Sequence, residues 1–177
     1  MSRSVLLLRA VNAGGHNRVP MARLREVLTS ETELTGISTY IASGNIVCDE
    51  IADASECCAR VREVIASEFA VDTPVIHRTH AELVASEAAQ PFADGADKLL
   101  HAMFLEIAPA PGSIKELESR LVPGEQIALI GRDLWINYPD GGVSATKLTK
   151  AVFDRTLGSA GTARNLRTVR TLIELTA

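Results

Sequence analysis

The residues best suited to chemistry lie in a short polar loop near the N-terminus, between an apolar run and a proline. The polar residues and glycines of this loop are Arg9, Asn12, Gly14, Gly15, His16, Asn17 and Arg18. Guanidinium, imidazole and amide groups gathered on a loop favour the binding of a polar or anionic ligand. Should chemistry occur at this loop, the imidazole of His16 is the member suited to serve as a general acid or base. The loop therefore predicts a binding site and leaves catalytic residues unassigned.

A second polar group, Ser43-Gly44-Asn45, is typical of a tight turn between two strands. In a split β-α-β unit, the end of the first strand and such a hairpin turn lie at the same edge of the sheet. Side chains from the two segments are then expected to converge, and these are Arg9, Asn12, His16, Asn17, Ser43 and Asn45. A purely structural interpretation competes with this one, because glycine and asparagine are also the ordinary residues of turns and helix caps.

Cations stand near the expected starts of three helices, where carboxylates are the usual residues. Arg18, Arg23 and Arg25 flank the first of these helices, Lys147 and Lys150 the penultimate one, and Arg164 and Arg167 the last, where Asn165 adds an amide. An anion at such a helix end would meet both free backbone N–H groups and a positive side chain. Lys147, Arg164 and Asn165 are accordingly expected to form a second wall of the anion site.

The net charge is −4, but its distribution is uneven. Residues 1–25 contain five arginines and no carboxylate, and residues 141–177 are also basic, so the intervening chain is strongly acidic. This pattern argues against general nucleic-acid affinity and permits a local anion site if the basic ends meet. Three cysteines, two of them adjacent, form no disulfide framework. Without a signal or membrane-spanning segment, a cytoplasmic protein that needs no cofactor or metal and binds no membrane is expected.

The first half of the chain alternates strands and helices in a recognisable order. The expected elements are a strand at Val5–Arg9, a helix from Pro20, strands at Ile37–Ile41 and Ile46–Cys48, a helix at Ala54–Phe69 and a strand at Val75–His77. The order strand, helix, strand, strand, helix, strand is that of the split β-α-β, or ferredoxin-like, arrangement.

The second half nearly repeats that order. We expect a strand within Leu99–Ile107, a helix at Ser113–Leu121, a hairpin of Gln126–Ile130 with Leu134–Tyr138, and helices at Thr146–Leu157 and Ala163–Leu175. A helix thus stands where the repeat would have its final strand. The prediction is an α+β chain of two ferredoxin-like subdomains, at 1–80 and 98–177, with a connecting helix and loop at 81–97 and an extra C-terminal helix.

Four segments together resemble a known family. They are Leu7-Leu8-Arg9-Ala10-Val11-Asn12-Ala13-Gly14-Gly15-His16-Asn17, Tyr40-Ile41-Ala42-Ser43-Gly44-Asn45, Lys147-Leu148-Thr149 and Thr162-Ala163-Arg164-Asn165. In order and placement they are similar to the bacterial family catalogued as domain of unknown function 1697. The resemblance implies paired ferredoxin-like domains and brings no activity or catalytic residue. Ala10, Ala13, Ala42 and Leu166 depart from the usual family pattern.

The leading functional hypothesis is binding of a small anion, such as a phosphate-bearing one, at loop ends between the two subdomains. Neither a P-loop nor a dinucleotide fingerprint is present, and His77, His80 and His101 lack the company of zinc ligands. One alternative is a non-enzymatic protein-interaction or homodimerisation module. Another is a single-stranded RNA-binding module, for which Trp135 and Tyr138 would have to supply the stacking platform.

Overall fold

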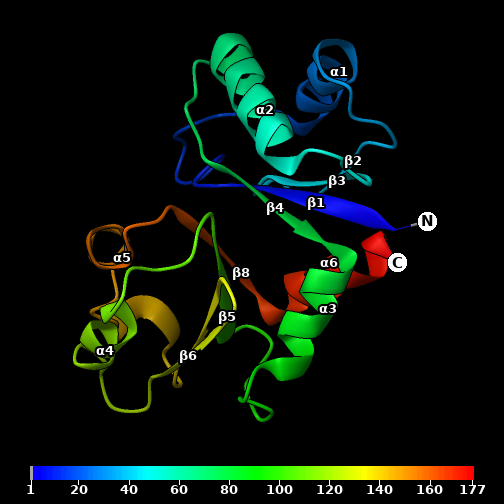
Figure 1. The fold of residues 1–177 in the computed structure, drawn as a ribbon. Helices are drawn as coiled ribbons and strands as arrows, with labels where there is room; N and C mark the ends of the chain where they lie inside the picture. Colours follow the sequence, from blue (N-terminus) through cyan, green and yellow to red (C-terminus); the bar gives the residue numbers. More distant parts are fainter. Residues whose placement is uncertain (1) are drawn as a thin grey trace. The chain divides into compact units, whose positions relative to one another are not determined.

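The computed structural model describes residues 2–177, which form two compact units (Figure 1). The first unit runs up to Leu83 and includes the final segment Leu172–Ala177, and the second unit is Val84–Thr171. The division passes through two helices, because α3 (His80–Ala89) and α6 (Leu166–Thr176) each contribute residues to both units.

The first unit contains a four-stranded antiparallel sheet and two helices. Its elements are β1 (Arg3–Leu8), α1 (Met21–Glu31), β2 (Ser38–Tyr40), β3 (Asn45–Asp49), α2 (Ala54–Phe69) and β4 (Val75–Thr79). The strand order is β2-β3-β1-β4, so β1 lies inside the sheet between β3 and β4. The helices lie together on one side of this sheet (Figure 1).

The core of the first unit follows from alternation along the strands. Leu6 and Leu8 of β1 point to the same face, where they join Ile46 and Cys48 of β3. Leu24 and Leu28 of α1 and Val61 and Ile65 of α2, each pair four residues apart, cover that face. Burial among these apolar side chains raises the pKa of the Cys48 thiol to about 12. All three cysteines are free thiols.

The second unit repeats this order of elements. It contains β5 (Leu100–Leu105), α4 (Ser113–Glu118), β6 (Gln126–Ile130), β7 (Asp133–Asn137), the 3₁₀ turn η1 (Gly142–Ala145), α5 (Lys150–Leu157) and β8 (Gly161–Asn165). The sheet order is β6-β7-β5-β8, with every pair antiparallel. Fold class is therefore mixed α+β with two four-stranded antiparallel sheets. Within residues 2–177, no helix is long and apolar enough to cross a membrane.

The strand β8 corrects the sequence prediction, which placed Arg164 at the start of a helix. Residues 161–165 pair with β5 along its length, and the final helix begins only at Leu166. The strand was missed because its buried positions are Thr162 and Arg164 rather than apolar residues. The alternation that marks a strand is present, but hydrophobicity does not reveal it.

The two units match in register as well as in order. Val5 of β1 pairs with Arg78 of β4, and Ala102, at the same place in β5, pairs with Arg164 of β8. Arg78 and Arg164 are both buried, and each donates through Nη1 to the carbonyl of the preceding residue, at 2.8 and 2.9 Å. Burial lowers the pKa of Arg164 to about 10. Arg164 is thus a buried residue of strand β8 rather than a cation at a helix start.

A pH-dependent stability is expected from His101 of β5. Its ring stands edge-on to Tyr138, its Nε2 donates to the Lys98 carbonyl at 3.0 Å, and burial lowers the pKa of its imidazole. A lowered pKa means that the unfolded chain takes up this proton first as the pH falls. The contribution is therefore complete above pH ~6.5, the ordinary value, and is lost as the pH falls toward the folded-state pKa.

We predict that urea unfolding of the His101→Gln variant will show a flatter fall in unfolding free energy below pH ~6.5 than the parent chain. Equal slopes for His101→Gln and the parent would contradict the assignment.

Candidate functional site

The loop between β1 and α1, residues 9–20, is held in a conformation that few sequences allow. Gly14 and Gly15 both have positive φ, at 58° and 79°, and the His16 N–H donates to the Ala13 carbonyl at 2.9 Å. Two central residues with positive φ closed by this bond are typical of a type I′ turn. Ala10, Asn12 and Asn17 also adopt positive φ, at 52–54°. The loop therefore has a defined conformation that its turn geometry and hydrogen bonds maintain.

Asn12 fastens this loop to the β2–β3 turn. Its Nδ2 donates to the carbonyls of Val19, at 2.9 Å, and Ala42, at 2.7 Å, and its Oδ1 accepts from the Val19 N–H at 2.8 Å. One amide side chain thus joins both ends of the loop to a turn some thirty residues further on. Its hydrogen-bonding capacity is nearly used up by the protein itself.

Two further contacts complete the frame of the loop. Asn17 Nδ2 donates to the Ala10 carbonyl at 3.1 Å. At the base of the loop, the buried Thr73 hydroxyl accepts from the Arg9 N–H at 2.9 Å and lies 3.0 Å from the Arg9 carbonyl. Thr73 cannot be recognised from the sequence, because nothing in its immediate neighbourhood marks it as a partner of residue 9.

The β2–β3 turn lies against the end of β1, as the split β-α-β order predicts. Leu8 N–H donates to the Gly44 carbonyl at 2.9 Å. Asn45 is fully buried, and its Nδ2 donates to the Tyr40 carbonyl and to Ser43 Oγ, both at 3.0 Å. Ser43 and Asn45 therefore shape the turn, which agrees with the structural interpretation of these two residues.

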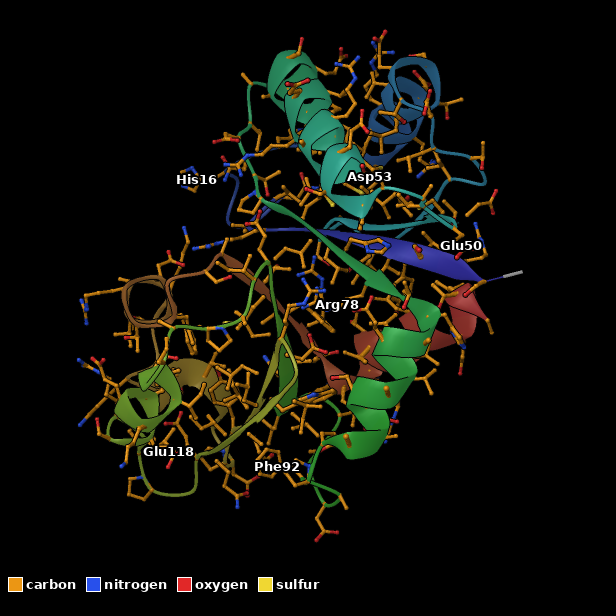
Figure 2. All side chains as sticks on the ribbon, viewed as in Figure 1. His16, Glu50, Asp53, Arg78, Phe92 and Glu118 are labelled. Carbon is orange, nitrogen blue, oxygen red and sulfur yellow. The ribbon has the colours of Figure 1, made fainter. Side chains whose placement is uncertain are left out.

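A pocket of about 330 Å³ opens where the loop meets the start of α1. Its lining residues are Asn12, Gly15, His16, Arg18, Val19, Pro20, Met21 and Ala42. His16 and Arg18 are exposed, and among residues 2–177 their side chains make no hydrogen bond or ion pair. Figure 2 shows the His16 side chain projecting outward from the loop. The polar side chains available to bind a ligand in this pocket are therefore the imidazole of His16 and the guanidinium of Arg18.

The start of α1 supplies the third element of this pocket. The N-cap residue is Pro20, no side chain caps the helix, and the first turn holds no carboxylate. The other helices of eight or more residues within 2–177 are capped by a side chain. The caps are Asp53 for α2, Thr79 for α3, Thr149 for α5 and Asn165 for α6. The unpaired N–H groups of α1 therefore direct their partial positive charge toward the pocket.

Comparison with known proteins supports the resemblance noted from sequence. A family model described as "Protein of unknown function (DUF1697)" matches residues 1–135. The chain belongs to this family. A search of curated proteins gave no match. Among solved structures, the chain is similar to one described as conserved bacterial protein SP0830 from Streptococcus pneumoniae, with 25% identity, a TM-score of 0.74 and 99% coverage of each chain.

The family match ends before the residues expected to form a second wall of the site. Lys147 is exposed and lies between η1 and α5. Asn165 Oδ1 accepts from the Thr168 N–H at 3.0 Å and so caps α6. Arg164 is buried in β8 and also donates to Thr162 Oγ1 at 2.8 Å. Of these three residues, Lys147 is the one whose side chain is exposed.

The arginines near the start of α1 differ in the partners of their side chains. Arg23 is paired with Glu68 at 2.6 Å and with Glu26 at 3.1 Å, and Arg25 donates to Thr39 Oγ1 at 2.6 Å. The charge of Arg23 is thus partly balanced by two carboxylates, whereas the Arg25 guanidinium is held by a neutral hydroxyl. Arg18 is the cation of this group that faces the pocket.

A larger hollow of about 790 Å³ lies in the first unit, between the end of α1 and the start of α2. It is lined by Glu31, Glu33, Asp49, Glu50, Asp53 and Glu56, with Arg60 and Cys57, and Figure 2 shows Glu50 and Asp53 at this place. Within residues 2–177, no three His, Cys, Asp or Glu side chains are grouped so as to hold a metal ion. The sequence shows that the middle of the chain is acidic, but it does not show that these carboxylates gather around one hollow.

The rings named for the RNA alternative are inside the second unit. Trp135 is fully buried, and its Nε1 donates to Ser86 Oγ at 2.9 Å. Tyr138 is also buried, and burial raises the pKa of its hydroxyl to about 12. Neither ring presents a face on which a base could stack.

A pair of glycine substitutions tests how tightly the loop and the turn approach each other. An added Cβ at Gly44 would lie 2.6 Å from Leu8 Cβ and 2.9 Å from Val11 Cγ2, whereas at Gly14 it would meet nothing within 4 Å. Both residues have positive φ, so both alanine variants carry backbone strain of about 1 kcal/mol. Gly44→Ala should lose a further 1–3 kcal/mol, roughly, from the clash. Chemical denaturation measures both, and equal losses would contradict the close approach.

Proposed function

We propose that the chain binds a small anion, such as a phosphate group, in the pocket between residues 12–21 and the β2–β3 turn. The observation that carries this proposal is the uncapped N-terminus of α1, which opens into a pocket beside His16 and Arg18. Backbone N–H groups at a helix start, joined by a guanidinium, are the elements that proteins use to hold phosphate and carboxylate groups.

The division of labour within the loop supports the same proposal. Asn12, Asn17 and Thr73 make hydrogen bonds that hold the backbone, whereas His16 and Arg18 remain directed to solvent. A rigid frame that carries two exposed polar side chains is the arrangement expected of a binding loop. Val19, Pro20, Met21 and Ala42 add an apolar floor, so the ligand is expected to be an anionic group carried by a small organic molecule.

We propose further that both units belong to the ferredoxin-like class. The element order βαββαβ and the strand orders β2-β3-β1-β4 and β6-β7-β5-β8 support this assignment. A cytoplasmic setting is proposed from the three free thiols. No catalytic residue is assigned.

Filling the helix end with the protein's own carboxylate should remove the anion response. Pro20 sits at the N-cap with φ −62° and ψ 126°, a conformation that a capping aspartate also adopts. Relative to Pro20→Ala, the Pro20→Asp variant should be more stable by about 0.5–1 kcal/mol in anion-free buffer. It should also lose the rise in melting temperature that inorganic phosphate and pyrophosphate give the parent, measured at matched ionic strength against chloride.

Side-chain variants provide the second arm of this test. Arg18→Ala and His16→Ala should each weaken pyrophosphate binding by about tenfold in isothermal titration, since each removes one polar contact to the anion. Lys115→Ala, which removes an exposed cation on α4, is the matched control and should bind as the parent does. Equal binding by the parent, Arg18→Ala and Pro20→Asp would refute the site.

A further inference from the structure

The pocket between residues 12–21 and the β2–β3 turn has more room than an anion alone requires. Its volume of about 330 Å³ is at the lower end of the range for pockets that hold small organic molecules, roughly 300–1,000 Å³. A bare phosphate group would therefore leave much of the pocket filled with water. Val19, Pro20, Met21 and Ala42 line it with apolar side chains. The group that carries the anion is thus expected to lie against an apolar surface.

Four oxygen acceptors at this pocket are already bonded within the protein. Asn12 Nδ2 donates to the carbonyls of Val19, at 2.9 Å, and Ala42, at 2.7 Å. Asn12 Oδ1 accepts from the Val19 N–H at 2.8 Å, and the Pro20 carbonyl accepts from the Leu24 N–H at 2.9 Å. A hydroxyl group of a ligand would lose its water here and gain, from these oxygens, a shared acceptor at best. The pocket therefore disfavours ligands that are rich in hydrogen-bond donors.

The charges at this pocket have one sign. Within residues 2–177, no aspartate or glutamate lines it, whereas Arg18 lines it with an exposed guanidinium. The first turn of α1 holds no carboxylate either. An ammonium group in the pocket would be repelled by Arg18 and by the positive end of the α1 dipole, and no lining carboxylate would offset that repulsion. Amino acids and phosphates that carry an amine are therefore disfavoured.

Three sources of N–H groups line the same pocket, and they are the start of α1, the Arg18 guanidinium and the His16 ring. A phosphate monoester offers three terminal oxygens to such donors, whereas a carboxylate offers two. Building on the anion site proposed above, on which this inference rests, we propose that the ligand is a phosphate monoester with a short, uncharged hydrocarbon body. Sugar phosphates and phosphates that carry an amine are rejected by the same pocket.

Isothermal titration of the parent chain with matched pairs of phosphate esters tests this selection. Propyl phosphate is glycerol 1-phosphate without its hydroxyls, and ethyl phosphate is phosphoethanolamine without its ammonium group. At pH ~8 each phosphate group is a dianion, because its second pKa is about 6. In each pair the hydrocarbon ester should bind about tenfold more tightly, since its partner buries hydroxyls without free acceptors or an ammonium without a counter-charge. Propyl phosphate should also bind several-fold more tightly than methyl phosphate, roughly as its extra apolar surface predicts.

A carboxylate at residue 42 should remove the preference against the ammonium group. Ala42 is exposed and lines the pocket, and it bonds to Asn12 through its backbone carbonyl, which a side-chain substitution retains. In Ala42→Asp, phosphoethanolamine should bind at least as tightly as ethyl phosphate, because the new carboxylate offsets its positive charge. Ala42→Asn has nearly the same shape without the charge and should keep ethyl phosphate as the tighter ligand. The readout is the ratio of the two affinities, since the added negative charge weakens both phosphates.

The outcomes separate this selection from the anion site itself. A parent chain that binds pyrophosphate but binds both members of either pair equally would overturn the selection and leave the anion site standing. A parent that binds neither pyrophosphate nor any ester would overturn both. An Ala42→Asp variant that is folded by circular dichroism and keeps the affinity ratio of Ala42→Asn would also overturn the selection. If that variant is unfolded, the two ester pairs decide the question, because they use the parent chain alone.

Discussion

The carboxamide of Asn12 is the interaction on which the proposed site depends. Through Val19 and Ala42 it joins the exit of β1, the entry to α1 and the β2–β3 turn. Each bond is ordinary in strength, about 1 kcal/mol. Their combined effect is geometric, since they fix where the uncapped end of α1 stands relative to His16 and Arg18. Without these hydrogen bonds, nothing described above would hold the loop against the β2–β3 turn, and the pocket between them would be lost.

Sequence patterns predicted the bounds of an element correctly where its apolar residues recur with the period of a helix or a strand. The helix Ala54–Phe69 and the strand Gln126–Ile130 were predicted with the bounds that the structure has, because the buried residues of the helix and the half-buried residues of the strand are apolar. The strand β8 was not, because Thr162 and Arg164 occupy its buried positions. The proximity of the N-terminal loop to Ser43–Asn45 was also predictable, since it follows from the order of the strands.

The roles of individual side chains in the loop lay beyond sequence reasoning. Asparagine serves both as a ligand-binding residue and as a turn-forming one, so composition alone leaves Asn12, Asn17 and Asn45 undecided. The structure shows their amides bonded to the backbone or, for Asn45, also to Ser43. The apolar floor of the pocket was equally hidden, because Val19, Met21 and Ala42 carry no chemical signal and become neighbours only through the fold.

The placement of Leu172–Ala177 in the first unit has a consequence for how the chain folds. Thr176 Oγ1 lies 2.8 Å from His80 Nδ1, and the Leu175 carbonyl accepts from Arg3 at 3.3 Å. These contacts join residues that are separated in the sequence by the whole of the second unit. On a ribosome, most of the first unit is synthesised early, but it lacks residues 172–177 until the second unit has been made. Its completion is therefore a late, long-range step, and removal of Leu172–Ala177 should weaken the N-terminal half of the molecule.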